Sequence, residues 1–316
     1  MKKRMVMAGL LCVLVCMCGC SSNRILSPLS TSNTTKYTAN YNITMQFTQN
    51  PDAKEAPLYT VQMGMAMDFE QIGSDTNVIS FQSKINSLNI KTEGQGDRLE
   101  YDSTQPTHAP TLFDSLIGTV LTFDTDKGGR ILNINGFDQV EKLAQKGTGG
   151  ENAEIAQILY SILLGPDSFK SYFSNLTGIY PEDTTIEKGE TWEKSYTPTS
   201  PIPLTINTAY TYSGISTDDN IVVTSESTVI APAEHKIETP QLNGTLRELN
   251  ATYAGKYLIA ENGGFAQSGT TDQTISASFV TGNESEGETA TPVRLSMKTA
   301  FVVNKTGVSP TSTPTK

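Results

Sequence analysis

Residues 37–47 read YTANYNITMQF, and residues 59–69 read YTVQMGMAMDF. Every second residue in both stretches is apolar, and the residues between are mostly polar or small. This period of two places the large side chains on one face of a β-strand. Two such strands in succession, each with one apolar face, predict a long, curved antiparallel sheet.

The same alternation continues along most of the chain, in two groups of strands. The first group is predicted at residues 37–47, 61–69, 76–92, 97–102, 118–124 and 130–135. The second group is predicted at residues 185–196, 203–214, 220–231, 245–260, 264–269, 272–281 and 293–304. Residues 125–129, which read TDKGG, form the turn that joins the last two strands of the first group, because glycine readily adopts a positive φ.

A central helical segment at about 137–178 separates the two groups of strands. Apolar residues at helical spacing predict helices at 137–146 and 151–164, and Gly165-Pro166 ends the second of these. Asp167 or Ser168 can cap a third helix after this break. The predicted fold class is therefore α+β and mainly β, with long curved antiparallel strands in two halves.

Glycines mark a similar pattern of strand, hairpin and strand in each half. In the first half they are Gly118, Gly128, Gly129 and Gly136, and in the second half Gly255, Gly263, Gly264 and Gly269. The pattern indicates either an internal duplication or two unrelated glycine hairpins.

The N-terminus has the divisions of a secretory signal. Three basic residues at 2–4 precede an apolar run at 5–17, which is too short to span a bilayer comfortably. Gly19 then precedes Cys20, which resembles the lipobox of bacterial lipoproteins, although residues 17–18 read MC where that motif usually has leucine and a small residue. The resemblance implies cleavage before Cys20 and acylation of its thiol. The alternatives are an ordinary cleaved signal or a short membrane helix.

Cleavage before Cys20 would leave Cys20 as the one cysteine of the mature chain, since all four cysteines lie within the first 20 residues. Ser21 directly follows the acylated cysteine, and by resemblance to the sorting of enterobacterial lipoproteins this implies the outer membrane. Residues 21–24 lack the acidic cluster that is associated with surface export in Bacteroidota, which favours a position of the protein facing the periplasm. The predicted divisions are a signal peptide (1–19), a flexible tether rich in Ser, Thr and Asn (20–35), an N-terminal β-rich half with the helices (36–178), a C-terminal β-rich half (179–306) and a disordered tail (307–316).

Composition and motifs argue against several classes of function. The net charge is −10 and no basic stripe is present, so we expect no nucleic acid partner. The two histidines, His108 and His235, stand apart in the sequence and lack the spacing of zinc hydrolases. We therefore predict no catalytic residue, no metal site and no cofactor.

A row of methionines is the most suggestive apolar feature. Met63, Met65 and Met67 lie on one face of a predicted strand, and Met45 lies on the neighbouring strand. Methionine is flexible and polarizable, so the four could line a lipid-sized pocket on the concave face. The alternative, which is the favoured interpretation, is that they pack under the central helices.

The junction between helices and strands carries a resemblance to a known family. Tyr180-Pro181, Ile186 and Gly189-x-x-Trp192, together with the two Gly-Gly hairpins, resemble a Bacteroidota-type family of bacterial envelope lipoproteins of unknown function. No activity is implied by that family. By pattern alone, the chain also resembles periplasmic lipid-carrier lipoproteins, in which a curved antiparallel sheet wraps helices around an apolar cavity.

These observations favour a non-catalytic, lipid-anchored envelope protein that binds an apolar or amphipathic ligand or a partner protein. The alternative is a structural or assembly component of the envelope with no ligand pocket.

Overall fold

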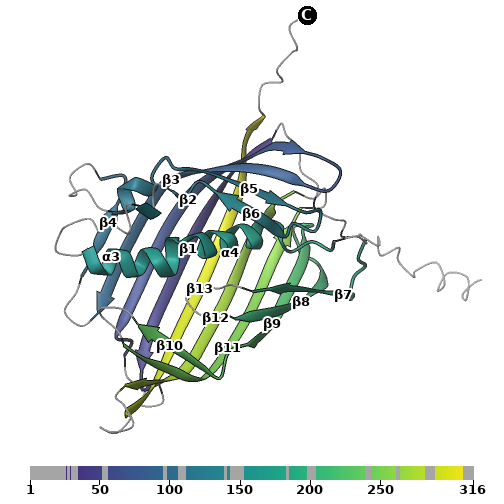
Figure 1. Ribbon diagram of the computed structural model, residues 1–316. Helices are drawn as coiled ribbons and strands as arrows, with labels where there is room; N and C mark the ends of the chain where they lie inside the picture. Colours follow the sequence, from purple (N-terminus) through teal and green to yellow (C-terminus); the bar gives the residue numbers. More distant parts are fainter. Residues whose placement is uncertain are drawn as a thin grey trace, which may run out of the picture.

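One antiparallel sheet of 13 strands forms the body of the protein (Figure 1). The computed structural model describes residues 26, 29, 35–51, 56–94, 98–105, 112–138, 141–142, 153–182, 185–197, 204–238, 243–260, 264–281 and 289–308. The strand order is β6-β5-β3-β2-β1-β13-β12-β11-β9-β8-β7, with β4 added to β3 and β10 added to β11. The predicted mainly β fold with antiparallel strands is confirmed.

The strands of the N-terminal group are β1 Thr35–Gln49, β2 Tyr59–Ser74, β3 Ile79–Gly94, β4 Glu100–Asp102, β5 Val120–Thr125 and β6 Ile131–Asn135. Those of the C-terminal group are β7 Thr191–Tyr196, β8 Thr205–Ile215, β9 Ile221–Ile230, β10 Glu234–Glu238, β11 Asn243–Ile259, β12 Ala266–Thr281 and β13 Thr289–Val308. The groups meet where β1 pairs with β13, so the two predicted halves share one continuous sheet.

The glycine hairpins that suggested a duplication occupy unlike places in this sheet. The first joins β5 and β6 at one end, whereas the second lies between β11 and β12 in the middle. The topology therefore gives no support to an internal repeat.

The central helices cross the face of the sheet that is seen in Figure 1. Helix α3, Ala153–Leu159, continues as a π-helical turn over Tyr160–Leu164, and α4 spans Pro166–Thr177. Gly165 is extended between them, with φ −78° and ψ 169°, and Pro166 opens α4 because its fixed φ suits the first helical position. The predicted break at Gly165-Pro166 is therefore confirmed, and the predicted helix at 137–146 falls largely outside the described residues.

The core lies between α4 and the sheet. Helix α4 buries four large side chains at spacings of three and four residues, namely Phe169, Tyr172, Phe173 and Leu176. The Phe173 ring stacks on Phe123 of β5 at a centroid distance of 4.4 Å and meets Phe69 of β2 edge-on at 5.5 Å. Each buried aromatic ring of this kind stabilises the fold by about 1.5–3 kcal/mol.

The strand predictions fail in two places. The predicted strands 264–269 and 272–281 are a single strand, β12, because its ladders to β11 and β13 run through the interruption in the apolar pattern. Gly269 within β12 lies where a Cβ would be only 2.6 Å from the Phe301 ring, so it serves close packing and not a turn. Strand β10 was not predicted and exists through its pairing with β11.

Three residues of the predicted flexible tether are bound to the body, namely Leu26, Leu29 and Thr35, the last of which begins β1. The backbones of Leu26 and Ile186 exchange hydrogen bonds of 2.9 and 3.0 Å, and the N–H of Leu29 donates to the carbonyl of Lys127 at 2.8 Å. Both leucine side chains are buried, which the polar composition around them did not indicate. Cys20 and the predicted signal peptide lie outside the described residues.

The C-terminal end also differs slightly from its prediction, because β13 continues to Val308 and thus into the predicted tail. Among the described helices, none combines the length and the apolar composition required to cross a membrane.

Candidate ligand-binding cavity

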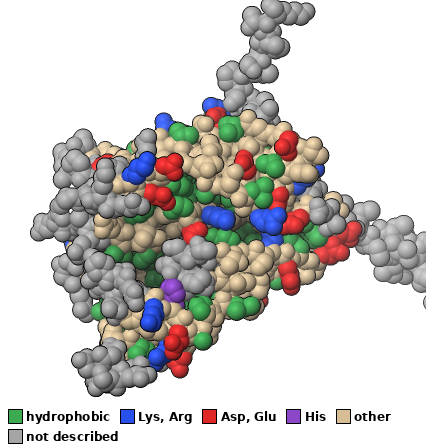
Figure 2. All heavy atoms as spheres, in the orientation of Figure 1, with side chains coloured by type: hydrophobic (Ala, Val, Ile, Leu, Met, Phe, Trp, Pro, Cys, Tyr) green, Lys and Arg blue, Asp and Glu red, His purple; other side chains and the backbone are tan. Residues whose placement is uncertain are grey.

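A cavity of about 560 Å³ lies between α4 and the sheet, on the side of β7 and β8. Its volume falls in the range of roughly 300–1,000 Å³ that is typical of small-molecule sites. One wall is the polar side of α4, and the opposite wall is formed by β8, β11, β12 and β13. Figure 2 shows hydrophobic side chains set into a hollow in the middle of this face, with Lys and Arg side chains next to it.

The cavity is lined by two kinds of side chain. Aliphatic ones come from the sheet, from the residue before β8 and from the middle of the π-helical turn, and include Ile131, Ile162, Leu204, Ile206, Ile275, Leu295 and Met297. Tyrosines add surfaces with both an apolar ring and a polar hydroxyl, namely Tyr172, Tyr196, Tyr210, Tyr253 and Tyr257. A ligand with both apolar and polar parts matches such a lining.

A buried polar contact ties the tyrosine wall to α4. Tyr257 and Tyr253 point to the same face of β11 because they are four residues apart, and their hydroxyls lie 3.3 and 3.4 Å from Oδ1 of Asn175. Burial raises the pKa of Tyr257 well above its ordinary value. Beside this cluster, Trp192 stacks on Tyr210 at 5.6 Å and packs against the core.

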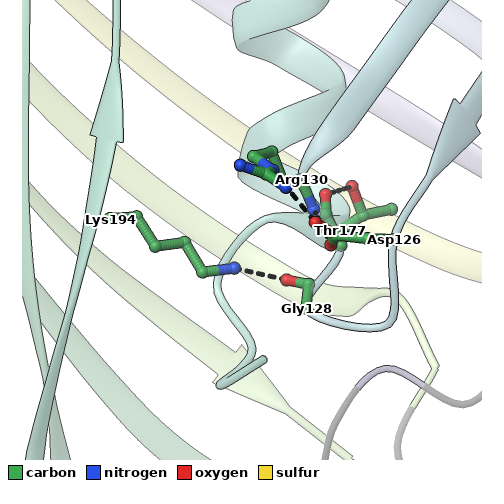
Figure 3. A network of polar contacts seen from close by, with 6 residues as sticks. Asp126, Gly128, Arg130, Thr177 and Lys194 are labelled. Atoms are coloured by element: carbon green, nitrogen blue, oxygen red, sulfur yellow. Dashed lines mark hydrogen bonds and ion pairs between the residues drawn. The ribbon is translucent and has the colours of Figure 1, made fainter. Parts of the chain in front are cut away.

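The two ends of the sheet meet at the cavity (Figure 3). Nζ of Lys194 on β7 donates a hydrogen bond to the carbonyl of Gly128, in the turn between β5 and β6. The same turn is fixed to α4, because Oγ1 of Thr177 donates to the carbonyl of Gly129 at 2.8 Å. Since β7 and β6 are opposite ends of the strand order, this contact makes the face that carries the helices concave.

The turn itself is held by an ion pair. Nε of Arg130 lies 2.9 Å from Oδ2 of Asp126, and the Arg130 backbone N–H donates to Oδ1 of the same carboxylate at 2.9 Å. Glu182 lies against Gly128 on the other side of the turn, so a Cβ on this glycine would be 2.6 Å from Glu182 Cγ. The turn is therefore closely packed between α4 and β7.

Lys194 is electrostatically unusual. Burial lowers its pKa to about 8, because the charged ammonium loses water, and the positive charge of Arg130 lowers it further. The negative charges of Asp126 and Glu182 act in the opposite direction. At neutral pH the ammonium is still protonated, so the cavity wall carries a poorly hydrated positive charge.

Two further groups lie in the gap between α4 and β7. Nζ of Lys170 lies 5.0 Å from the centroid of the Tyr196 ring. The Tyr196 hydroxyl is buried and has no hydrogen-bond partner among the described residues. Burial raises the pKa of Tyr196, and the nearby charge of Asp167 raises it further, so this hydroxyl remains a proton donor at physiological pH.

A family model matches residues 75–266, which is 192 of the 316 residues. The chain belongs to the DUF6263 family. This is a family of unknown function. A sequence comparison with curated proteins finds no match.

Among solved structures, this DUF6263 protein is similar to a lipovitellin chain, from a structure described for its lipid–protein interactions. The TM-score is 0.50 at 17% identity, and the match covers 90% of this chain and 27% of the lipovitellin chain. At this identity the likeness shows a shared fold. Two further structures match at 8% identity and a TM-score of 0.17. The match with Pseudomonas aeruginosa OpdQ covers 87% of this chain and 100% of that one, and the match with Acinetobacter baumannii OccAB4 covers 88% and 99%. Neither likeness is strong enough to support a conclusion about this protein.

The structure places the predicted methionines in the packed core beside the cavity. Met45, Met63, Met65 and Met67 are at most 6% exposed, and none of them lines the cavity. Met45 is paired across β1 and β13 with Met297, which does line it. Sequence reasoning missed the tyrosines, although their period of four residues in β11 and their recurrence in β8 were visible.

The candidate chemical residues are dispersed in this DUF6263 protein. His235 lies half-buried on β10, whereas His108 and Cys20 are outside the described residues. No group of three His, Cys, Asp or Glu side chains that could hold a metal ion occurs in the part of the chain that the structure describes.

Proposed function

We propose that this protein is a non-catalytic lipoprotein of the bacterial envelope that holds an apolar or amphipathic ligand in the cavity between α4 and the sheet. The observation that carries the proposal is the cavity of about 560 Å³ with its aliphatic and tyrosine lining. The fold shared with lipovitellin, a protein described for its lipid–protein interactions, supports a lipid as the ligand.

The proposed anchor is a lipid on Cys20, which would hold the protein on the outer membrane, facing the periplasm. Leu26 is already bound to the body, so only six peptide steps separate it from Cys20. A fully extended chain of this length spans about 20 Å, which would keep the edge of the sheet close to the membrane surface. One acyl chain holds a protein weakly and two or more hold it stably, so we expect several chains on the mature N-terminus.

The ligand proposal is tested with residues 21–316, since every contact that the structure describes lies within 26–308. We expect native mass spectrometry to detect a co-purified lipid, and we expect uptake of the fluorescent probe 1-N-phenylnaphthylamine. Ser174→Trp would fill the cavity from α4 and reduce uptake at least tenfold. Ser161→Trp is the matched control, because Ser161 is exposed on the preceding π-helical turn and does not line the cavity.

If neither lipid nor probe binds, the ligand proposal fails, and the alternative is a structural or assembly component of the envelope. Crosslinking in cells would then support that alternative if one envelope protein dominates the products. The anchor is tested separately by the intact mass of the full-length protein from membranes. Cys20→Ser should abolish the added mass of the acyl chains, and an unmodified wild-type mass would contradict the anchor.

A further inference from the structure

Three hydrogen-bond donors converge on the gap between α4 and β7, at one end of the cavity. Lys194 and Tyr196 are two residues apart on β7, so both point to the inner face of the sheet, and Lys170 of α4 lies over the Tyr196 ring at 5.0 Å. All three line the cavity.

The Lys194 ammonium has donor capacity to spare. It carries three N–H bonds, and among the described residues it has one acceptor, the carbonyl of Gly128. No carboxylate of the described part lies within ion-pair distance of it, although Asp126 and Glu182 act on it from farther away. A poorly hydrated ammonium in this state interacts strongly with an added anion.

The Tyr196 hydroxyl is an independent sign of a missing acceptor. Buried polar groups in proteins are nearly always hydrogen-bonded, and an unpaired one is unfavourable. This hydroxyl is buried and has no partner in the part of the chain that the structure describes. An oxygen atom of a ligand head in the gap would accept from it.

The rest of the cavity suits the apolar part of such a ligand. Ile275, Leu295 and Met297 line it on β12 and β13, far from β7 in the strand order. Five strand spacings of about 4.8 Å separate β7 from β13 along the sheet, which gives a path of about 24 Å. A long alkyl chain fits along this path.

Three carboxylates also line the cavity, from Asp167, Glu182 and Glu193, and they balance the charges of Arg130, Lys170 and Lys194. Arg130 is already paired with Asp126. The balance does not select a ligand of high net charge. An oxyanion is favoured by the donors that converge beside β7 and not by the total charge of the lining, and it can stand alone or next to a cationic group in a zwitterionic head.

We propose that the ligand is a long-chain amphiphile whose head is an oxyanion, a carboxylate or a phosphate, bound by the ammonium groups of Lys194 and Lys170 and by the Tyr196 hydroxyl. Its chain runs across the sheet from β7 towards β12 and β13. This inference rests on the proposed function and specifies the class of ligand.

Calorimetric titration of residues 21–316 with dodecanoate, dodecyl phosphate and uncharged dodecanol tests the inference, because the three share one chain and differ in the head. The two anions are expected to bind at least tenfold tighter than dodecanol. Lys194→Met should remove most of this preference of the site for the two anions over dodecanol. Lys298→Met is the matched control: Lys298 is exposed on β13, faces away from the cavity and should have no effect.

Tyr196→Phe provides a second test that does not depend on the Lys194–Gly128 contact. Its hydroxyl has no partner among the described residues, so we expect the variant to fold as the wild type does. We expect dodecanoate to bind about threefold or more weakly to this variant. If Lys194→Met does not fold, the proposed oxyanion head is tested with Lys170→Met and Tyr196→Phe instead. Unchanged dodecanoate affinity in both of these variants would overturn the inference.

The remaining outcomes distinguish the proposed apolar ligand from its proposed oxyanion head. Equal affinity for dodecanol and dodecanoate would overturn the oxyanion head but leave the proposed apolar ligand intact. Binding of none of the three amphiphiles would contradict both. Inorganic phosphate that binds as tightly as dodecyl phosphate would show a site for the free anion and would overturn the amphiphile.

Discussion

Gly129→Ala is expected to destabilise the fold strongly, because this glycine combines a strained backbone with a close contact. Its φ is +77°, and a Cβ would lie 1.6 Å from the carbonyl oxygen of Thr177 at the end of α4. A non-glycine residue at this φ costs about 1–2 kcal/mol. Displacement of the turn would also break the 2.8 Å bond from Thr177 Oγ1 to the Gly129 carbonyl. A buried group left unpaired costs about 1–3 kcal/mol more.

The total expected loss is therefore about 2–5 kcal/mol in the free energy of unfolding, measured by urea denaturation of residues 21–316. Gly118→Ala is the matched control, since Gly118 has a φ of +79° but nothing within 4 Å of its hypothetical Cβ. This control should lose only the backbone cost of about 1–2 kcal/mol. Equal losses for the two variants would refute the reasoning that the turn is packed tightly against α4.

Three further predictions concern the core, the N-terminal segment and Lys194. Phe173→Ala removes a fully buried ring that stacks on Phe123, so it should lower the free energy of unfolding by about 3–5 kcal/mol. Its control is Ile158→Ala, at an exposed position, which should change the free energy of unfolding by less than about 1 kcal/mol. Leu26→Ser should lower it by about 2 kcal/mol, because Leu26 is 2% exposed; a value near zero would mean that this segment does not dock in solution. Burial holds the pKa of Lys194 at about 8, below the unfolded value of about 10.4, so the unfolded chain binds more protons between these values. Stability should therefore rise by about 1–2 kcal/mol from pH 8 to 10 in the wild type relative to Lys194→Met, and parallel pH profiles in urea denaturation would contradict this.

The predictions from sequence succeeded where a feature is local. Alternation in residues 37–47 predicted β1 because the side-chain period of a strand is independent of its neighbours. Gly165-Pro166 predicted the break before α4 because proline has no N–H to donate and fixes its φ. The same reasoning failed at residues 270–271, where a break between two strands was predicted but β12 is continuous, because pairing on both sides decides the conformation there.

The candidate cavity was not predicted from the sequence. The methionine row is buried in the core and none of its four residues lines the cavity, although Met297, which pairs with Met45 across β1 and β13, does. Neither Lys194 nor Tyr196 carried a sequence signal, since a lysine and a tyrosine two residues apart are common on exposed strands. Their role depends on α4 and the β5–β6 turn, which are far away in the sequence and close only in the folded chain.

The sequence by itself determined most of the strands, the apolar face of these strands and the break before α4, because these depend on periodicity and on glycine and proline. The tertiary structure alone decided how far the sheet curves, which strands lie at its ends and where the cavity opens. These properties depend on long-range contacts such as the one between Lys194 and Gly128, which joins β7 to the turn between β5 and β6. Alternation requires apolar residues on the inner face whether that face is filled or hollow, so only the packing of α4 against the sheet could distinguish a core from a binding site.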